Sequence, residues 1–343
     1  MQNHEFFMQK CIELSKNGIG SVSPNPIVGS LIVYNGKVIG EGYHERPGSN
    51  HAEVNAINSV KDKSLLSKST LYVNLEPCSH FGKTPPCSDL IIKCKIPTVV
   101  VGCIDTYSEV SGTGIEKLRK AGIDVKIEIM KKESRELNKR FFTFHEKKRP
   151  YIILKWAESK DGFIAPKYQT GPFWMTSAKS KKLVHKWRSE EDAILIGRIT
   201  AEKDNPSLTV RETKGDNPIR IIIDKDLKLS SNLKLFNSKS ETIIINEIKT
   251  DYKSKNNNYI KVDFNGLINN MLYELYKRRI QSLIIEGGAT TIQSFIDKNI
   301  WDEARIFKAN KNIENGVRPP KINGKISSEI QIDTDSLKII IND

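Results

Sequence analysis

Short apolar runs rich in β-branched residues alternate with segments of helical spacing along the first half of the chain. Strands are predicted at 28–44, 70–75, 98–103 and 123–130, and Asn35-Gly36 favours a hairpin turn within the first run. The predicted helices lie at 3–18, 51–60, 88–94, 112–122 and 131–148. Strands that alternate with helices in this way pack as layered α/β domains.

The alternation begins again after a basic stretch that ends in Arg149-Pro150. Strands are predicted there at 151–159, 192–197, 218–224, 240–246 and 281–288, and helices at 177–190, 266–279 and 290–299. We expect the lysine- and asparagine-rich stretch 247–258 to be an exposed loop. Because 343 residues are too many for one ordinary core, the sequence predicts two α/β domains, 1–147 and 150–343.

The chain carries a formal net charge of +13. A polyanionic partner such as nucleic acid is one explanation of this charge. The lysines are scattered, however, without an arginine-rich tract or interleaved aromatic residues. We therefore expect small phosphorylated ligands and no nucleic-acid partner.

No stretch approaches the roughly 20 apolar residues that cross a bilayer, and the N-terminal segment lacks a basic region followed by an apolar run. We therefore expect a cytoplasmic protein that is not attached to a membrane. An odd number of cysteines in such a chain argues against a disulfide framework. Three of the five, Cys11, Cys94 and Cys103, lie in or beside apolar segments and are explained as small buried hydrophobes.

The other two cysteines belong to a group of residues with metal-binding chemistry. Cys78 and Cys87 each follow a proline, and His51 and Glu53 begin a predicted helix upstream. One histidine and two thiolates, with a fourth position open to water, are the ligand set of a catalytic zinc ion. Zinc lowers the pKa of bound water towards neutrality, and a nearby carboxylate can then move its proton. A closed structural zinc site, or two buried cysteines, is the alternative.

The motifs around these residues resemble a known family. The segments "PNPIVG" (24–29), "GYH" (42–44), "HAE" (51–53) and "EPCSHFGKTPPC" (76–87) are similar to the deaminase half of bacterial bifunctional riboflavin-biosynthesis deaminase/reductases. Zinc nucleobase deaminases in general have two residues between the cysteines. This chain has eight, as that family does.

The resemblance implies a cytidine-deaminase-like α/β/α domain that acts on a diaminopyrimidinone carrying a ribosylamino 5-phosphate. It implies that zinc is held by His51, Cys78 and Cys87, one ion per chain, with Glu53 as the proton shuttle. Asn25, His44 and Lys83 become candidates for holding the base and the phosphorylated ribose. Members of the family often have Asp-Pro-Asn-Pro where this chain has "DTYS" (105–108), so different ligand contacts are expected there.

The second half resembles the reductase half of the same family. The segments "LKWAESKDG" (154–162), "WMTS" (174–177), "AEKDNPSLTVR" (201–211), "PIRIIID" (218–224) and "EGGATT" (286–291) follow in the family's order. The resemblance implies a dihydrofolate-reductase-like α/β domain that uses NADPH. Glycines between a strand and a helix also suit a bound phosphate, although such a turn needs glycines in any case.

Carried over position by position, the resemblance implies three groups of residues in this half. The cofactor would be bound by Ala157, Trp174, Thr200, Asp204, Gly288, Ala289, Thr290, Thr291, Ile292, Gln293 and Ser294. The substrate would be bound by Arg188, Leu208, Arg211 and Glu286, with the arginines suited to its phosphate. Lys155 is a candidate proton donor at the sugar carbon that receives hydride, with a structural ion pair as the alternative.

The sequence thus predicts a bifunctional enzyme of riboflavin biosynthesis, which deaminates a small phosphorylated pyrimidine and then reduces its ribosyl group to ribityl. We also expect a homo-oligomer. Departures from the family at Lys160, Pro172 and Lys225, and an unusual C-terminus, keep a deaminase with a degenerate reductase half open. Two further alternatives are a zinc deaminase of nucleic acid, of the tRNA adenosine type, and a structural zinc domain fused to a nucleotide-binding module.

Overall fold

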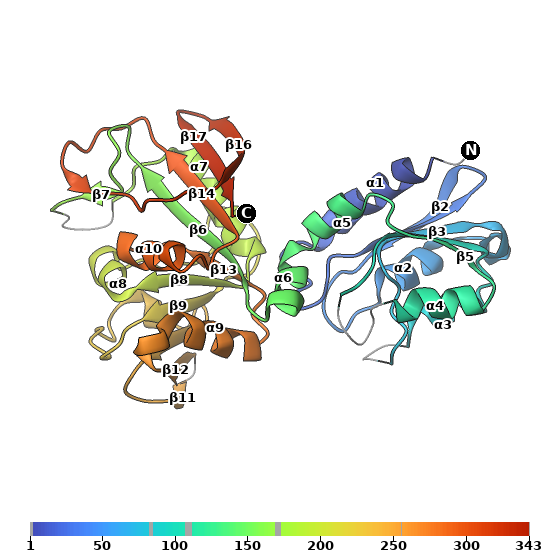
Figure 1. The fold of residues 1–343 in the computed structure, drawn as a ribbon, viewed down its shortest axis with the longest axis horizontal. Helices are drawn as coiled ribbons and strands as arrows, with labels where there is room; N and C mark the ends of the chain where they lie inside the picture. Colours follow the sequence, from blue (N-terminus) through green and yellow to red (C-terminus); the bar gives the residue numbers. More distant parts are fainter. Residues whose placement is uncertain (1–2, 82–84, 107–111, 169–172, 255, 343) are drawn as a thin grey trace. The chain divides into compact units, whose positions relative to one another are not determined.

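The computed structural model describes residues 3–81, 85–106, 112–168, 173–254 and 256–342. The chain divides into two compact units, Met1–Lys148 and Arg149–Asp343, each built on its own sheet (Figure 1). Among the described residues, no helix is both long and apolar enough to span a membrane.

The first unit has a five-stranded mixed sheet. Its strands are β1 (Gly29–Tyr34), β2 (Lys37–Tyr43), β3 (Thr70–Leu75), β4 (Thr98–Cys103) and β5 (Asp124–Lys126). The order is β2-β1-β3-β4-β5, with β1 antiparallel to both neighbours and β3, β4 and β5 parallel. Asn35 and Gly36 have φ values of 46° and 72°, as the predicted hairpin turn requires, so this prediction is confirmed.

Helices cover both faces of this sheet (Figure 1). They are α1 (His4–Ser15), α2 (Ala52–Ser59), α3 (Cys87–Lys93), α4 (Thr113–Lys120), α5 (Lys131–Leu137) and α6 (Lys139–Lys147), with 3-10 turns at Lys16–Gly18 and Lys63–Lys68. On one face Ala56, Ile91 and Leu118 of α2, α3 and α4 pack against buried strand residues. On the other, Met8 and Leu137 of α1 and α5 lie in a cluster with strand residues such as the buried Tyr72. The fold is a three-layer α/β/α arrangement.

Two predicted elements of this unit differ from the structure. The strand expected over 123–130 ends at Lys126, because the chain then turns at Glu128 and Met130, whose φ values are positive. The helix expected over 131–148 is broken at Asn138. The Asn138 side chain accepts the N–H of Ile27 at 2.7 Å and donates to its carbonyl at 2.9 Å, a tertiary contact that local periodicity does not encode.

The second unit has a larger sheet. Its strands are β6 (Tyr151–Glu158), β8 (Ala193–Gly197), β9 (Ile219–Ile223), β10 (Thr242–Asn246), β11 (Asp251–Ser254), β12 (Asn257–Lys261), β13 (Ser282–Ile285), β14 (Glu303–Lys308), β16 (Lys325–Ile332) and β17 (Asp335–Ile341). The order is β11-β12-β10-β9-β8-β13-β6-β14-β17-β16. The seven strands from β12 to β14 in this order are parallel, and antiparallel strands flank them at both edges. A separate pair, β7 (Ala165–Pro166) and β15 (Gly316–Val317), links two loops.

Helices also lie on both faces of the parallel strands (Figure 1). They are α7 (Ala178–Glu190), α8 (Arg198–Asp204), α9 (Leu267–Lys277) and α10 (Ala289–Asp297), with 3-10 turns at Lys234–Phe236 and Phe264–Gly266. Met271 and Phe295 of α9 and α10 are buried against one face of the sheet. Val184 and Ala201 of α7 and α8 are buried against the other. Parallel strands covered on both faces explain the near-continuous isoleucine runs of β9, β10 and β13.

The expectation of an exposed loop at 247–258 is wrong. This stretch contains β11 and the start of β12, which pair antiparallel at one edge of the sheet. An edge strand tolerates lysine and asparagine because it is less covered than a central strand, so its sequence lacks the usual apolar signal.

Candidate active sites

In the first unit, three potential metal ligands come from three separate segments. His51 is the residue that precedes the first turn of α2, and Cys87 is the first residue of α3. Cys78 lies in the loop that follows β3, three residues beyond Leu75. The carboxyl end of β3 and the starts of α2 and α3 therefore meet at one edge of the sheet.

The three side chains point their donor atoms at a common space. His51 Nδ1 is 3.5 Å from Cys78 Sγ and 3.3 Å from Cys87 Sγ, and all three donor atoms lie within 4.8 Å of one another. A tetrahedral zinc ion, with Zn–S near 2.3 Å and Zn–N near 2.0–2.1 Å, separates a thiolate sulfur from an imidazole nitrogen by about 3.6 Å. The residues present therefore fit a zinc ion without rearrangement.

Electrostatics in this cluster favour a thiolate. Hydrogen bonds from the Cys87 thiol, from His51 and from the Cys87 backbone N–H, which lies 3.3 Å from Cys78 Sγ, lower the pKa of the Cys78 thiol. Glu53 follows in the first turn of α2 and is only 4% exposed. Burial and the neighbouring Cys78 raise the pKa of Glu53 to about 7. A carboxyl group in this state can both take up and release a proton near neutral pH.

Asn25 and His44 are also brought to this cluster. Asn25 Nδ2 lies 2.9 Å from His44 Nε2, and His44 Nδ1 lies 3.0 Å from the carbonyl oxygen of Asn50. The His44 ring meets the His51 ring edge to face, with 5.6 Å between centroids. Burial lowers the pKa of His44, which favours a neutral ring that donates through Nδ1 and accepts through Nε2. Lys83, Tyr107 and Ser108 lie outside the described residues.

The sequence analysis did not identify Glu76, which lies two residues before Cys78. Its buried carboxylate accepts backbone N–H groups of Asp105, Gly112, Gly114 and Ile115 at 3.0–3.3 Å. A Cβ atom at position 114 would collide with the carbonyl oxygen of Pro77. Glu76 thus fastens the start of α4 directly against the loop that carries Cys78. Glu76 begins the motif 76–87, but nothing in that motif indicated that its carboxylate would accept backbone N–H groups.

In the second unit, two of the predicted substrate residues, Arg188 and Glu286, meet near the carboxyl end of β13, beside β6 and β8. These strands are parallel neighbours, so their carboxyl ends share one edge of the sheet, where α/β proteins bind ligands. Glu286 directly follows β13, and its backbone N–H donates to Leu195 at 3.0 Å. Arg188 of α7 donates to both carboxylate oxygens of Glu286, at 3.2 Å and 2.6 Å. Lys155 of β6 lies close enough for its charge to act on Glu286.

The glycine pair after Glu286 allows helix α10 to begin close to neighbouring residues. Gly288 has a φ of 73°, which side chains rarely tolerate, and a Cβ at Gly287 would lie 2.7 Å from Ile196. Thr200 and Thr291 are the closest side chains to an added Cβ at Gly288, both with Oγ1 at 3.4 Å. The predicted cofactor residues 288–294 therefore form the first turns of α10, with Thr200 of α8 beside them. Backbone N–H groups at such a helix start suit a phosphate.

The other predicted residues of this half lie on flanking segments. Ala157 is near the end of β6, and Asp204 is the last residue of α8. The exposed Trp174 ring lies 5.5 Å from Lys181 Nζ. Leu208 is buried with a φ of 50°, and Arg211 follows it with its Nη1 atom 3.0 Å from Thr209 Oγ1.

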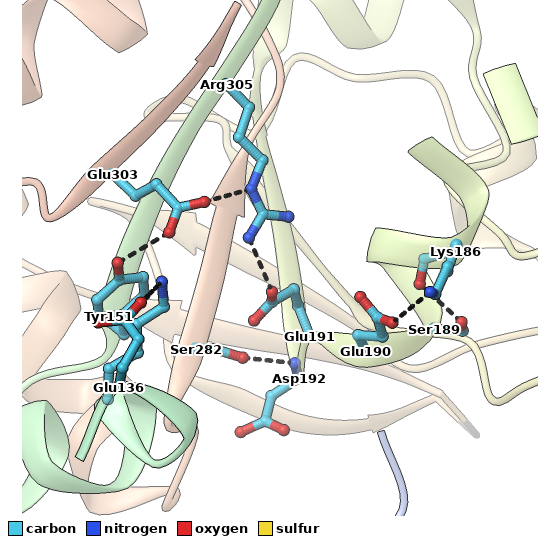
Figure 2. Close-up of polar contacts among 11 residues, drawn as sticks. Glu136, Tyr151, Lys186, Ser189, Glu190, Glu191, Asp192, Ser282, Glu303 and Arg305 are labelled. Atoms are coloured by element: carbon cyan, nitrogen blue, oxygen red, sulfur yellow. Dashed lines mark hydrogen bonds and ion pairs between the residues drawn. The ribbon is translucent and has the colours of Figure 1, made fainter. Parts of the chain in front are cut away.

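A second buried ionic group lies at the opposite, amino ends of β6 and β14. Figure 2 shows the Glu303 carboxylate between Tyr151 and Arg305, with Oη–Oε2 and Nε–Oε1 distances of 2.9 Å and 2.5 Å. Arg305 also lies 3.6 Å from Glu191 and stacks on the Trp187 ring at 4.6 Å. Since these contacts join strand ends away from the glycine turn, we read the group as structural.

Two family descriptions match this chain. Residues 1–103 match the "Cytidine and deoxycytidylate deaminase zinc-binding region", and residues 150–321 match the "RibD C-terminal domain". The riboflavin biosynthesis protein RibD of Aquifex aeolicus (strain VF5) is 41% identical over 318 residues, which cover 91% of this chain and 88% of the relative. RibD of Escherichia coli (strain K12) is 32% identical over 331 residues, 92% of this chain and 89% of the relative.

Solved structures of the same kind superpose on the chain. A diaminohydroxyphosphoribosylaminopyrimidine deaminase/5-amino-6-(5-phosphoribosylamino)uracil reductase from Thermotoga maritima is 36% identical with a TM-score of 0.89, and the match covers 99% of this chain and 98% of that chain. Acinetobacter baumannii RibD, form 1, is 30% identical with a TM-score of 0.89, and 98% of each chain is covered.

Proposed function

The chain belongs to the RibD family of bifunctional deaminase/reductases of riboflavin biosynthesis, and we propose that its two units act in turn on 2,5-diamino-6-(5-phosphoribosylamino)pyrimidin-4-one. Membership confirms the predicted fold class, a cytidine-deaminase-like unit followed by a reductase unit. The match across both halves favours this function over a deaminase of nucleic acid and over a structural zinc domain. The observation that carries the deaminase assignment is the convergence of His51, Cys78 and Cys87 beside the buried Glu53.

In the deaminase unit, His51, Cys78 and Cys87 would hold one zinc ion through Nδ1 and two sulfurs. Zinc bound there supplies a water of lowered pKa as the nucleophile. Glu53 would take one proton from the attacking water and deliver it to the ring nitrogen, and then move the remaining hydroxyl proton to the amine, which leaves as ammonia when the C–N bond breaks. Burial suits Glu53 to this role, since it raises the pKa of the carboxyl to about 7.

Asn25 and His44 hold the pyrimidine in our proposal. Their mutual hydrogen bond and the His44–Asn50 contact fix both side chains next to His51, so that the base meets a preformed polar surface. The Ile27 backbone, clamped by Asn138 and by Asn74 Nδ2 at 3.0 Å, fixes the segment that carries Asn25. Lys83 remains the candidate for the ribose phosphate by the family resemblance alone.

In the reductase unit, we propose that NADPH lies over the glycine turn and the start of α10. NADPH supplies the hydride. Thr200 and Thr291 flank Gly288 and offer hydroxyl groups, while the N–H groups of the first turn offer positive charge to a phosphate. Ala157, Trp174, Asp204 and the remaining residues of 288–294 complete the proposed cofactor site, as the family resemblance implies.

The substrate of the reductase unit lies, in our proposal, against Arg188, Leu208, Arg211 and Glu286. Arg188 and Glu286 are locked together by two hydrogen bonds, whereas Arg211 is exposed and open to an anion. Lys155 is the proposed proton donor at the sugar carbon. Burial lowers the pKa of Lys155, which makes its ammonium a better acid than a lysine in water.

We further propose a cytoplasmic homo-oligomer. All five cysteines are free, which suits a reducing compartment but does not require one. Light scattering of the purified chain at micromolar concentration measures the number of subunits, and a monomer there would contradict the oligomer.

One assay tests both proposed activities. The intact protein is incubated with the diaminopyrimidine ribosyl phosphate, with and without NADPH and with and without a zinc chelator, and products are identified by mass. We expect exchange of an amine for oxygen in the absence of NADPH, and addition of two hydrogens only when NADPH is present. A chelator should stop the first step, whereas the deaminated compound, when it is supplied directly, should still be reduced with NADPH. Reduction without deamination, or neither, would contradict the proposal.

A further inference from the structure

His185 is a fully buried histidine beside the proposed substrate residues of the reductase unit. It lies on α7, one helical turn before Arg188, and its side chain is 0% exposed. A buried histidine in an otherwise apolar cluster is usually held by hydrogen bonds from both ring nitrogens. The two nitrogens of His185 differ in this respect.

One ring nitrogen holds the backbone of Arg211. His185 Nδ1 accepts the N–H of Arg211 at 3.1 Å, so Nδ1 carries no proton. The ring proton of the neutral imidazole must then lie on Nε2, which is buried and has no hydrogen-bond partner among the described residues. A buried donor without a partner destabilises the fold, because nothing replaces the water that it loses. If position 185 served packing alone, an apolar side chain would therefore stabilise the fold more than this histidine.

The charges around His185 keep its ring neutral. Arg188 and Arg211 are its positive neighbours, and Glu212 and Glu286 its negative neighbours. Burial, followed by the two arginines, lowers the pKa of His185 to about 4. An imidazolium has no lone pair with which to accept the Arg211 N–H. The same surroundings that disfavour the charged ring therefore preserve the hydrogen bond.

The segment that His185 holds is strained. Leu208, three residues before Arg211, has a φ of 50°. A non-glycine residue in this conformation is strained and persists only where surrounding contacts determine it. The Arg211 side chain is steadied separately, by Nη1 contacts to the oxygens of Thr209 at 3.0 Å and 3.3 Å. His185 fixes the backbone, and Thr209 the guanidinium.

We propose that His185 is a positioning residue of the reductase site, which holds the Arg211 backbone so that the guanidinium groups of Arg211 and Arg188 face the same anionic part of the substrate. The inference rests on the proposed substrate role of these two arginines. Burial, followed by the positive charge of Arg188, lowers the pKa of Arg211, and His185 lies close enough to both arginines to feel their charges. Two cations held close together against their repulsion suit a phosphate, since its oxygens can bond both.

Three substitutions in the intact chain separate this role from packing. His185→Asn keeps an acceptor oxygen near the Nδ1 position, His185→Gln places its oxygen near Nε2 instead, and His185→Leu has no acceptor. The KM for the deaminated ribosylaminopyrimidine, the KM for NADPH and kcat are measured for each. We expect His185→Gln and His185→Leu to raise the substrate KM about tenfold or more, with kcat and the NADPH KM within about twofold. His185→Asn should stay within about threefold of the wild-type substrate KM.

Several results would overturn the inference. One is a substrate KM for His185→Asn that is raised as much as that for His185→Gln. Another is a wild-type substrate KM for both His185→Gln and His185→Leu. A third is a change in kcat or in the KM for NADPH while the substrate KM stays unchanged. If the Leu variant does not fold, the comparison of Asn with Gln still decides, since both are polar amides. If Arg211→Ala has a normal substrate KM, then Arg211 does not bind the substrate, and the inference about His185 fails as well. A raised KM for Arg211→Ala beside normal His185 variants would reject the inference alone.

Discussion

Arg188 and Glu286 form a bidentate ion pair whose side chains are only 7% and 8% exposed. Although burial alone opposes ionisation of Glu286, the charges of Arg188 and Lys155 outweigh it and lower the pKa of Glu286 to about 2. The pair joins α7 to the end of β13. The same two residues that we propose to bind the substrate therefore also stabilise the second unit.

Stability of this unit should fall with acid because of Glu286. Between pH 4.5 and about 2 the unfolded chain takes up a proton at Glu286 that the folded chain does not, so stability is complete above pH 4.5 and decreases as pH falls towards 2. The full effect is about 3 kcal/mol. Urea unfolding at several pH values measures it, followed by fluorescence of Trp156, Trp174, Trp187 and Trp301, all of which lie in this unit.

Glu286→Gln is the matched comparison for that titration. It keeps the shape of the side chain but cannot ionise, and it leaves Arg188 without its charged partner. We expect lower stability at pH 7 and a shallower decline between pH 4.5 and 3 than in the wild type. Parallel curves for the two proteins would show that another group is responsible.

Glu53→Gln should abolish deamination selectively. The amide cannot take up or release the proton, and loss of a general acid–base typically lowers the rate by about 10²–10⁴-fold. Ammonia release measures the effect. Because the substitution is in the first unit and retains side-chain volume, zinc content and NADPH-dependent reduction of the deaminated compound should stay near wild type. Deamination at the normal rate would remove Glu53 from its role.

Glu76→Gln should destabilise the loop that carries Cys78 without changing any of the three proposed zinc ligands. The amide group would present N–H donors to backbone N–H groups that now donate to the carboxylate. We expect a loss of about 2–4 kcal/mol in unfolding free energy and faster zinc release to a chelator. Glu45→Gln, on an exposed residue of the same unit, is the control and should change neither quantity. Unchanged zinc release in Glu76→Gln would show that α4 does not support Cys78.

Gly288→Ala should weaken NADPH binding more than substrate binding. The φ of 73° strains a side chain, and the new methyl group would lie 3.4 Å from the hydroxyls of Thr200 and Thr291. We expect the KM for NADPH to rise about tenfold, while the KM for the pyrimidine changes by less than about twofold. A rise in the pyrimidine KM alone would place the cofactor elsewhere.

The sequence predicted most of what depends on local pattern. Strands β1, β3, β4, β6 and β13 follow from β-branched runs, and the hairpin from Asn35-Gly36, because these signals are contained in a few consecutive residues. The convergence of His51, Cys78 and Cys87 was predicted from residue types, since few other combinations suit one metal ion.

What the sequence did not reveal depends on distant contacts. The helical pattern breaks at Asn138, whose side-chain oxygen accepts a hydrogen bond from the backbone N–H of Ile27, 111 residues away in the sequence. Glu76 and His185 are ordinary polar residues until folding brings Gly114 and Arg211 beside them. The C-terminal strands β14, β16 and β17 were not assigned either, because charged residues such as Arg305, Glu329 and Lys338 interrupt their apolar runs.

The position of β13 in its sheet has a consequence during protein synthesis. This strand inserts between β6 and β8 although it begins at residue 282, after all but the C-terminal part of the chain. The first unit needs nothing beyond residue 148 to complete its sheet and its cluster of donor atoms. A nascent chain can therefore fold its deaminase unit before β13 has been synthesised. At that stage β6 and β8 lack the strand that lies between them in the finished sheet. If synthesis stopped between residues 148 and 282, the deaminase unit would be complete, but the sheet of the second unit would lack β13 and would expose strand edges that are prone to aggregate.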